Sequence, residues 1–417
     1  MNYPDSVQFL YALGNEIKTV KLGLERIRAV LDALGRPHDQ CRFVHVAGTN
    51  GKGSTCAMIE SGLRAAGQRT GLFTSPHLAK PTERIRIDGR PISAAEFADA
   101  FNRVHVVVEG LIESGAIDLH TTYFETVTAM ALLVFAEQET DRVVLEVGLG
   151  GRLDATNVVQ PGLCVITPID FDHEQYLGRS IEAIAGEKAG ILKQGIPAVF
   201  SRQRPEAEAV LERRAAELKI AVARTSDCKI ENVDIDVRGS RFDLDGMHVS
   251  CPLAGEHQVG NAATAALALR QIGVVPDGIA NTVWPGRLER VSEYPEIILD
   301  GAHNPAGARA LAAYIERFYS GRRVQLIYGA MRDKAVAEIA GILFPLAQQV
   351  IVTAPRQARA LSPEALRDVA YHPNLYVAPT LDVALELVRD AAHDDVVFIT
   401  GSLFLVAEAR ASLSRLL

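Results

Sequence analysis

The chain has 417 residues, of which 48% are hydrophobic and 23% charged, and its formal net charge at pH 7 is −8. This length exceeds one typical hydrophobic core and predicts two domains of ordinary globular composition. The negative balance, without a compensating basic cluster, argues against an extended nucleic-acid surface. The 5 cysteines are scattered, as is typical of reduced thiols in a cytoplasm. We expect a cytoplasmic protein without membrane partners, because neither a signal-peptide pattern nor an apolar run of ~20 residues occurs. A monomer is the default expectation, because no exposed apolar patch can be read from the sequence.

Residues 5–35 have the pattern of two helices separated near Gly14, the second beginning near Leu22. An apolar, β-branched run at 43–47 then predicts a buried strand, and residues 54–66 have helical composition. The turn between this strand and this helix is rich in glycine and carries one lysine: Gly48-Thr49-Asn50-Gly51-Lys52-Gly53-Ser54.

Such a turn can cradle phosphate groups. Its three glycines allow positive φ angles and close backbone approach, so amide N–H groups can point at phosphate oxygens. The helix dipole and Lys52 add positive charge. The turn therefore predicts a nucleoside triphosphate site, and the alternative is a glycine-rich turn that binds nothing.

The turn differs from the generic phosphate loop, because Val46 stands at the position of the first glycine and Gly53 follows the lysine directly. With His45-Val46-Ala47 before it, the turn instead resembles the loop of the muramyl-peptide ligase superfamily and, within it, the folylpolyglutamate synthase and dihydrofolate synthase branch. The resemblance covers essentially the whole chain. It implies an α/β fold, with an ATP-binding, P-loop ATPase-like domain around a mostly parallel sheet at residues 1–286 and a smaller Rossmann-like glutamate-ligase domain at residues 287–417.

A short predicted strand precedes Ser75-Pro76. Because a proline disfavours helix for the residue before it, Ser75 is expected in an extended loop at the carboxyl end of that strand, where ligands collect in open α/β sheets. Residues 84–92 then predict a hairpin, and Ser93 with Glu96 predicts a capping box that opens a helix to about residue 113.

Two adjacent aromatic residues precede a helix that we predict at 125–138, within the stretch Thr122-Tyr123-Phe124-Glu125. Aromatic residues in such a place are most often part of the core. The resemblance implies instead that the stretch lines a substrate pocket, with Phe124 stacking on a pterin ring.

The run at 142–147 predicts a buried strand with one acid, Glu146, near its end. A buried acid is costly unless it is paired or bound to a metal, so Glu146 is a candidate metal ligand or the partner of an arginine. The glycine-rich segment 148–157 follows, and 146–157 matches the family without a gap. The resemblance places Arg152 and Asp154 at the substrate, where Asp154 would face the paired N–H donors of the pterin.

Beyond the next strand, His173 follows Asp170 and Asp172, and a predicted helix at 180–194 carries Lys188. A lone histidine is more often structural, whereas the resemblance makes His173 a metal ligand and leaves Asp170 without explanation. By itself, Lys188 would be a solvated partner of its neighbour Glu187. The resemblance implies that carbon dioxide carbamylates Lys188, which requires a neutral amine.

In the last third, Asn261 lies near the start of an alanine-rich helix, where asparagine is by default a cap; the resemblance implies an ATP contact. The helical pattern breaks at 284–289, the predicted hinge, and the resemblance implies that Arg287 reaches the phosphates on domain closure. Strands then alternate with helices as in a doubly wound unit. The resemblance puts Asp300 on the ribose and His303 near the phosphates or the incoming amino acid. The strands are predicted near 296–299, 323–328, 349–353, 374–378 and 395–399.

A carboxylate accepts an amine poorly because oxide is a poor leaving group, whereas an acyl phosphate made from ATP releases phosphate readily. The site must therefore hold two anions together with positive charge and metal. The resemblance gives Lys52 and the loop amides to the phosphates, and Ser75 and Glu146 to a first Mg²⁺. Glu146, His173 and carbamylated Lys188 would hold a second ion, for which Mn²⁺ is an alternative because nitrogen ligands are unusual for Mg²⁺.

We therefore predict an ATP-dependent ligase that joins L-glutamate to dihydropteroate, forming dihydrofolate, and to the γ-carboxylate of reduced folates. Folylpolyglutamate synthase activity alone and another muramyl-peptide-type ligase are the alternatives within the class. A regulatory protein that hydrolyses ATP without forming a bond is the alternative outside it.

Overall fold

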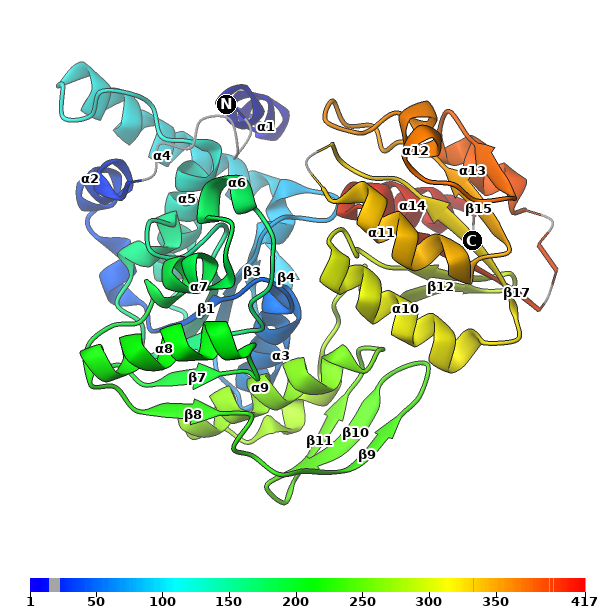
Figure 1. Cartoon of the computed structure of the whole chain (residues 1–417). Helices are drawn as coiled ribbons and strands as arrows, with labels where there is room; N and C mark the ends of the chain where they lie inside the picture. The colour runs from blue at the N-terminus through cyan, green and yellow to red at the C-terminus, as the bar shows by residue number, and fades with distance from the viewer. Residues whose placement is uncertain (15–22, 333, 390, 393, 417) are drawn as a thin grey trace. The chain divides into compact units, whose positions relative to one another are not determined.

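The structure is a computed structural model that describes residues 1–14, 23–332, 334–389, 391–392 and 394–416. The chain divides into two compact units, whose elements Figure 1 labels. Unit 1 consists of Met1–Glu231, Asp243–Val249 and Gly260–Thr282, and unit 2 of Asn232–Phe242, Ser250–Val259 and Val283–Leu417.

The described part of unit 1 is built on an eight-stranded sheet with the order β4-β3-β2-β5-β1-β6-β7-β8. From β2 to β8 neighbouring strands are parallel, and β3 and β4 are antiparallel additions at one edge. The strands are β1 (Phe43–Ala47), β2 (Thr70–Phe73), β3 (Ile85–Ile87), β4 (Arg90–Pro91), β5 (Arg142–Glu146), β6 (Leu163–Ile166), β7 (Ala198–Phe200) and β8 (Val222–Arg224). All residues of β1 are buried. The segments that follow β1, β2, β5 and β6 therefore gather at one edge of the sheet.

Helices pack on this sheet around two large apolar clusters, one including Phe43, Phe101 and Phe135 and the other Ile166, Ile184 and Phe200. The α-helices up to the end of unit 1 are α1 (Tyr3–Ala12), α2 (Glu25–Ala33), α3 (Lys52–Ala65), α4 (Ala94–Glu113), α5 (Tyr123–Glu137), α6 (Glu174–Leu177), α7 (Ile181–Ala189), α8 (Pro205–Leu218) and α9 (His257–Gln271). The 3-10 helices are η1 (Pro37–Gln40), η2 (Pro81–Arg84), η3 (Ala155–Val158) and η4 (Pro276–Asn281). The predicted beginning of the second helix at Leu22 lies outside the described residues.

Local signals set several boundaries as predicted. Ser93 and Glu96 form the capping box of α4, and the hairpin of β3 and β4 turns at Asp88 and Gly89, both with positive φ. Two boundaries differ. α5 begins at Tyr123, because Thr122 and Glu125 form a second capping box. α7 ends at Ala189 rather than near residue 194, where the chain turns away beside the loop that follows β5.

Three short antiparallel strands form a separate sheet of order β11-β10-β9: β9 (Ile230–Ile235), β10 (Ser240–Leu244) and β11 (Met247–Cys251). These are the short alternating strands expected before the alanine-rich helix α9. Within the described residues, no helix is both long and apolar enough to cross a membrane.

The described part of unit 2 is a second α/β layer structure. Its six-stranded sheet has the order β12-β13-β17-β14-β15-β16. Neighbouring strands are parallel except for β12, which is antiparallel to β13. The five predicted strands are confirmed, and β12 is an addition that the sequence did not reveal. The strands are β12 (Glu289–Glu293), β13 (Glu296–Leu299), β14 (Arg323–Tyr328), β15 (Gln349–Val352), β16 (Leu375–Val377) and β17 (Asp395–Thr400). The helices are α10 (Pro305–Tyr319), α11 (Val336–Leu343), η5 (Phe344–Leu346), α12 (Pro363–Val369), α13 (Leu381–Leu387) and α14 (Leu403–Leu416). The fold class expected from the sequence is confirmed.

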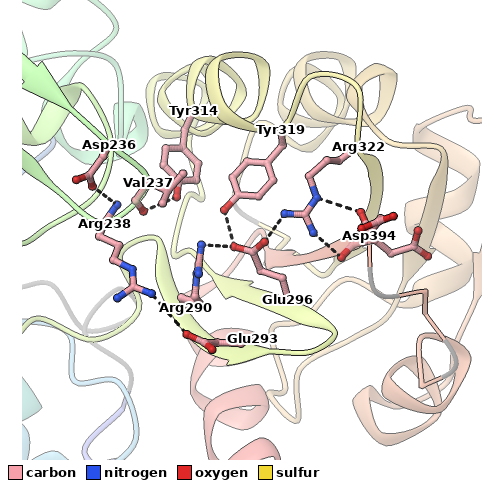
Figure 2. Close-up of polar contacts among 11 residues, drawn as sticks. Asp236, Val237, Arg238, Arg290, Glu293, Glu296, Tyr314, Tyr319, Arg322 and Asp394 are labelled. Carbon is pink, nitrogen blue, oxygen red and sulfur yellow. Dashed lines mark hydrogen bonds and ion pairs between the residues drawn. The ribbon is translucent and has the colours of Figure 1, made fainter.

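A buried carboxylate ties four segments of unit 2 together (Figure 2). Glu296 begins β13 and is 5% exposed; its side chain accepts a hydrogen bond from Tyr319 Oη at 2.7 Å and forms ion pairs with Arg290 and Arg322. Arg322 also donates to the backbone carbonyl of Asp395, at the start of β17, at 3.0 Å. The ends of β12, β13, α10 and β17 are thus fixed through one acid.

We predict that Glu296→Ala destabilises unit 2 by about 3–5 kcal/mol, because it leaves two arginines without their buried counter-ion. Urea unfolding followed by the fluorescence of Trp284, the single tryptophan of the chain, measures this loss. The control is Glu293→Ala, which removes only an exposed pair, Arg238 to Glu293 at 3.5 Å, and should cost less than about 1 kcal/mol. Equal effects of the two substitutions would contradict the stabilising role of the network.

Candidate active site

The loop between β1 and α3 has a conformation that requires glycine at two positions. Gly48 and Gly51 have φ angles of 152° and 80°. A Cβ at Gly48 would lie 1.9 Å from Thr167 Oγ1, and one at Gly51 would lie 2.2 Å from Asn261 Oδ1. The loop therefore packs against the end of β6 and the start of α9, and the predicted ATP contact Asn261 lies beside it.

Two backbone amides of the loop are used in hydrogen bonds to the segment after β6. The amides of Thr49 and Asn50 both donate to the Pro168 carbonyl, at 2.9 and 3.1 Å. The hydroxyl of Thr49 donates to the carbonyl of Asp170 and accepts from its amide. The first N–H groups of a helix lack intrahelical acceptors, and in α3 these are the groups of its first turn, at 52–54.

Two lysines converge on the carbonyl oxygen of Gly48. Lys52 Nζ donates to it at 3.2 Å and also to the Thr49 carbonyl, and Lys188 Nζ donates to it at 2.8 Å. Lys188 comes from α7 and is 4% exposed. Burial, followed by the positive charge of Lys52, lowers the pKa of Lys188 to about 7, with Asp172 and Asp154 opposing the shift. A large fraction of this amine is therefore neutral near pH 7.

The neighbour of Lys188 has a different partner. Glu187 Oε1 accepts from Arg152 Nη2 at 2.9 Å and from its Nε at 3.1 Å. The solvated pair of Glu187 and Lys188 considered from the sequence is therefore wrong. Arg152, for which a place at the substrate stays a prediction, connects the loop after β5 to α7 through this pair.

The structure brings Ser75 and Glu146 together. Glu146 ends β5, is 3% exposed, and accepts a hydrogen bond on Oε2 from the Ser75 amide at 2.9 Å. It lies directly opposite Val46 of β1, next to the phosphate loop. A buried carboxylate next to a serine, at the edge of the sheet where the loop begins, fits the oxygen ligands that Mg²⁺ prefers.

His173 and the two acids before it lie on the segment after β6. His173 precedes α6 with a φ of 52°, and its amide donates to Asp172 Oδ1 at 2.9 Å. The unexplained acid, Asp170, forms an ion pair with Arg204 Nη1 at 3.0 Å. Asp170 also binds Thr49 through its backbone, so it links the phosphate loop to the start of α8.

The carboxylate of Asp154 is used within its own loop. It is 5% exposed and accepts hydrogen bonds from the amides of Leu149 and Thr156, at 2.8 and 3.0 Å, and from the Thr156 hydroxyl. Burial raises the pKa of Asp154 in spite of these bonds. These contacts shape the glycine-rich loop and were not evident from the sequence.

The residues around the start of α5 divide between structural and exposed roles. Glu125 caps the helix with Thr122 and pairs with Arg26 Nη2 at 3.1 Å. Tyr123 is 3% exposed, which agrees with the core alternative. Phe124 is half-buried and packs closely against Gly148 in the loop after β5. A Cβ at Gly148 would lie only 2.4 Å from Phe124 Cζ.

A cluster beside Tyr123 was missed by sequence reasoning. Tyr11 stacks on the Tyr123 ring with centroids 5.7 Å apart, and the Arg84 guanidinium lies 5.0 Å from its centroid. Arg84 Nε donates to His77 Nδ1 at 2.9 Å, and Tyr11 Oη lies 3.3 Å from His77 Nε2. Burial, followed by the charge of Arg84, lowers the pKa of His77 to about 3, so this imidazole is neutral. The only sequence signal was the position of His77 two residues after Ser75.

In unit 2, Asp300 and His303 follow β13, and Arg287, which precedes β12, lies beside the same segment. Asp300 is 7% exposed and accepts from the amides of Leu288 and Ala302, each at 3.0 Å. Burial raises its pKa, and Arg287 opposes the shift. A Cβ at Gly301 would lie 2.4 Å from Arg287 Nη1, and His303 Nδ1 donates to the Gly301 carbonyl at 2.8 Å. Arg287, Asp300 and His303 thus surround one turn of backbone.

Comparisons with known proteins agree with both units. Residues 46–269 match the Mur ligase middle domain, and residues 286–403 match the Mur ligase, glutamate ligase domain. A Bacillus subtilis protein named dihydrofolate synthase/folylpolyglutamate synthase is 37% identical over 411 residues, covering 94% of this chain and 95% of its own length. The Escherichia coli protein of the same name is 36% identical, covering 94% and 91%.

Solved structures give the same result. Mycobacterium tuberculosis folylpolyglutamate synthase complexed with ADP superposes with a TM-score of 0.92 at 36% identity, covering 99% of both chains. Escherichia coli FolC in complex with DHPP and ADP superposes with a TM-score of 0.87 at 34% identity, covering 98% of both. The chain therefore belongs to the Mur ligase family and is an ATP-dependent ligase. Within that family it belongs to the dihydrofolate synthases/folylpolyglutamate synthases, as the sequence predicted.

The lowered pKa of Lys188 makes a prediction for stability. Between about pH 7 and 10 the unfolded lysine keeps a proton that the folded one has lost, so the free energy of unfolding rises with pH. In buffer free of bicarbonate, wild type should gain ~1.4 kcal/mol per pH unit over Lys188→Met in this range. Urea unfolding followed by circular dichroism measures the difference. Parallel pH profiles of the two proteins would mean that the pKa of Lys188 is not lowered.

Proposed function

We propose that this chain joins L-glutamate to dihydropteroate, forming dihydrofolate, and to the γ-carboxylate of reduced folates. In both reactions the acceptor carboxylate first takes the γ-phosphoryl group of ATP, and the amine of L-glutamate then displaces phosphate from the acyl phosphate. The observation that carries the proposal is the convergence of Lys52 and Lys188 on Gly48, next to Glu146, in a chain that matches ligases over almost its full length.

In this proposal Lys52 and the first turn of α3 bind the β- and γ-phosphates. Both belong to the turn that the β1 strand holds in place, and positive charge there offsets the repulsion between ATP and a carboxylate substrate. Asn261 lies against the same loop and would orient the nucleotide.

Ser75 and Glu146 would hold one Mg²⁺, and Glu146, His173 and a carbamylated Lys188 a second, with Mn²⁺ as an alternative. Bound there, the ions would neutralise the γ-phosphate and the substrate carboxylate and so allow their approach. Carbamylation forms a bond between the neutral Lys188 nitrogen and the carbon of carbon dioxide, and one proton leaves to solvent. A pKa of about 7 supports this step, because the neutral amine is the nucleophile.

We assign to Arg287, Asp300 and His303 of unit 2 the contacts with the nucleotide and with L-glutamate. The match of residues 286–403 to a glutamate ligase domain supports this assignment. Residues from the start of α5 and from the loop after β5 are proposed to surround the pterin. Phe124 would stack on the ring, and the others would position these two segments: Thr122, Tyr123, Glu125, Arg152 and Asp154.

Both the double and the single activity have relatives that support them. Relatives from Bacillus subtilis and Escherichia coli carry both activities in their name, and a Lacticaseibacillus casei relative, 36% identical and covering 99% of both chains, is named folylpolyglutamate synthase.

The deciding assay supplies ATP, Mg²⁺ and L-glutamate with either dihydropteroate or tetrahydrofolate and follows ADP release and product mass. A glutamate added to both acceptors supports the proposal. A gain on tetrahydrofolate alone reduces it to tail extension, and ADP release without either acceptor favours simple ATP hydrolysis.

Substituting the loop lysine tests the phosphate assignment. Lys52→Ala should lower kcat by about 10³-fold or more with the fold intact, because it removes the positive charge that would stabilise the phosphoryl group during its transfer. The matched control is Lys229→Ala, an exposed lysine paired with Glu231, which should leave kcat unchanged. Activity of Lys52→Ala within tenfold of wild type would contradict the assignment.

Carbamylation can be observed directly. With carbon-13-labelled bicarbonate, the carbon-13 NMR spectrum of wild type should contain a carbamate signal that Lys188→Ala lacks, and bicarbonate should raise wild-type activity. Small carboxylates such as acetate should restore part of the activity of Lys188→Ala, because they replace the missing oxygens. An active wild-type enzyme without the carbamate signal would remove the modification from the mechanism.

A further inference from the structure

Three side chains with metal-ligand chemistry meet on unit 1 outside the residues assigned to the reaction. His105 and Glu109 lie one turn apart on α4 (cyan in Figure 1), and His120 lies on the segment between α4 and α5. His105 Nδ1, a Glu109 carboxylate oxygen and His120 Nε2 lie within 4.8 Å of one another. In the part of the chain that the structure describes, no other three His, Cys, Asp or Glu side chains converge in this way.

The tautomer of His120 is set by its backbone contact. Its Nδ1 lies 2.9 Å from the carbonyl oxygen of Thr121, which can only accept, so Nδ1 carries the proton. In the neutral ring the lone pair of Nε2 then faces Glu109. Metal-binding histidines commonly donate the N–H of their other ring nitrogen to a backbone carbonyl, as His120 Nδ1 does here.

The two facing nitrogens lack hydrogen bonds. His105 Nδ1 and His120 Nε2 are both buried and have no hydrogen-bond partner among the described residues. Each lies 3.8 Å from Glu109 Oε1, which is too far for a hydrogen bond. Buried ring nitrogens without a hydrogen-bond partner are unfavourable, and a bound cation would remove this cost.

The spacing suits an ion of the zinc class. With metal–ligand bonds of about 2.0–2.2 Å, tetrahedral ligands lie about 3.4 Å apart. Each histidine nitrogen is 3.8 Å from Glu109 Oε1 and all three ligand atoms lie within 4.8 Å of one another, so the three side chains draw closer together when they bind an ion. Two imidazoles and one carboxylate favour Zn²⁺, Co²⁺ or Ni²⁺ over Mg²⁺ and Ca²⁺, which prefer oxygen ligands.

Aromatic rings hold both imidazoles in place. His105 stacks on Phe101 with centroids 5.5 Å apart and planes 13° apart. Phe9 of α1 contacts both histidine rings, at centroid distances of 4.8 Å to His105 and 5.4 Å to His120. Glu109 is about half exposed and gives an ion a route of entry from solvent. The buried Phe101 and the half-buried Phe9 thus hold the two imidazoles in place.

We propose that His105, Glu109 and His120 bind one transition-metal ion of the zinc class, with water completing its coordination. The ion would connect α4 to His120, which lies two residues before Thr122, the N-cap of α5. The site is separate from the proposed reaction and requires neither ATP nor folate.

Binding is tested on the full chain after removal of metal with EDTA. Isothermal titration with Zn²⁺ in excess Mg²⁺, which competes at oxygen-rich sites, should give one saturable site that is at least about 100-fold weaker in Glu109→Gln and in His120→Ala. Glu109→Gln keeps the shape of an exposed side chain, so folding is not in question. Co²⁺ should give visible absorption bands in wild type that both variants lose.

Two controls separate this site from others. His248→Ala removes an exposed histidine that lies 3.2 Å from Asp243, and it should leave the titration unchanged. The melting temperature should rise with Zn²⁺ in wild type and not in Glu109→Gln, whereas in EDTA the two proteins should melt alike. Zinc binding of equal strength in wild type and in both ligand variants, or no saturable binding in wild type, would overturn the proposal.

Discussion

The carbonyl oxygen of Gly48 accepts hydrogen bonds from two lysines at once, and much of unit 1 depends on how this is possible. Two ammonium groups at one acceptor repel each other, so the arrangement favours an uncharged Lys188. The depth of Lys188 is in turn set by two glycines. A Cβ at Gly151 would lie 2.7 Å from the Glu187 carbonyl, and one at Gly190 would lie 2.3 Å from Arg152 Cβ. The glycine-rich loop after β5 thus lets α7 approach closely enough to place an amine beside the phosphate loop.

Sequence reasoning succeeded where a feature is local or follows from strand order. The capping box of α4, the turn at Asp88-Gly89 and the strands of unit 2 are encoded within a few residues each. The meeting of Ser75 and Glu146 also follows from simple topology, because β2 and β5 are parallel neighbours whose carboxyl ends share an edge. The family itself was evident from its motifs.

Features that depend on long-range packing were not predictable. The pairing of Asp170 with Arg204 and the hydrogen bonds within the Asp154 loop arise only when separate segments are in place. The same holds for the cluster around His77 and for the ions around Glu296, whose partners come from three other segments. Spacing along a sequence carries no signal for such contacts. The resemblance gave Asp154 a role at the substrate, whereas its visible contacts are those of a loop anchor.

The strand order of unit 2 has a consequence for synthesis of the chain. β17, the last strand in sequence, lies between β13 and β14, and Arg322 joins Glu296 to the first residue of β17. During translation β13 and β14 therefore wait for their shared neighbour until nearly the whole chain has left the ribosome. The eight-stranded sheet of unit 1 is complete in sequence at Arg224 and has no such dependence. The two units consequently mature at different times. In a chain that stops before β17, β13 can still pair with β12 and β14 with β15, but one apolar edge of each of β13 and β14 is left open to aggregation.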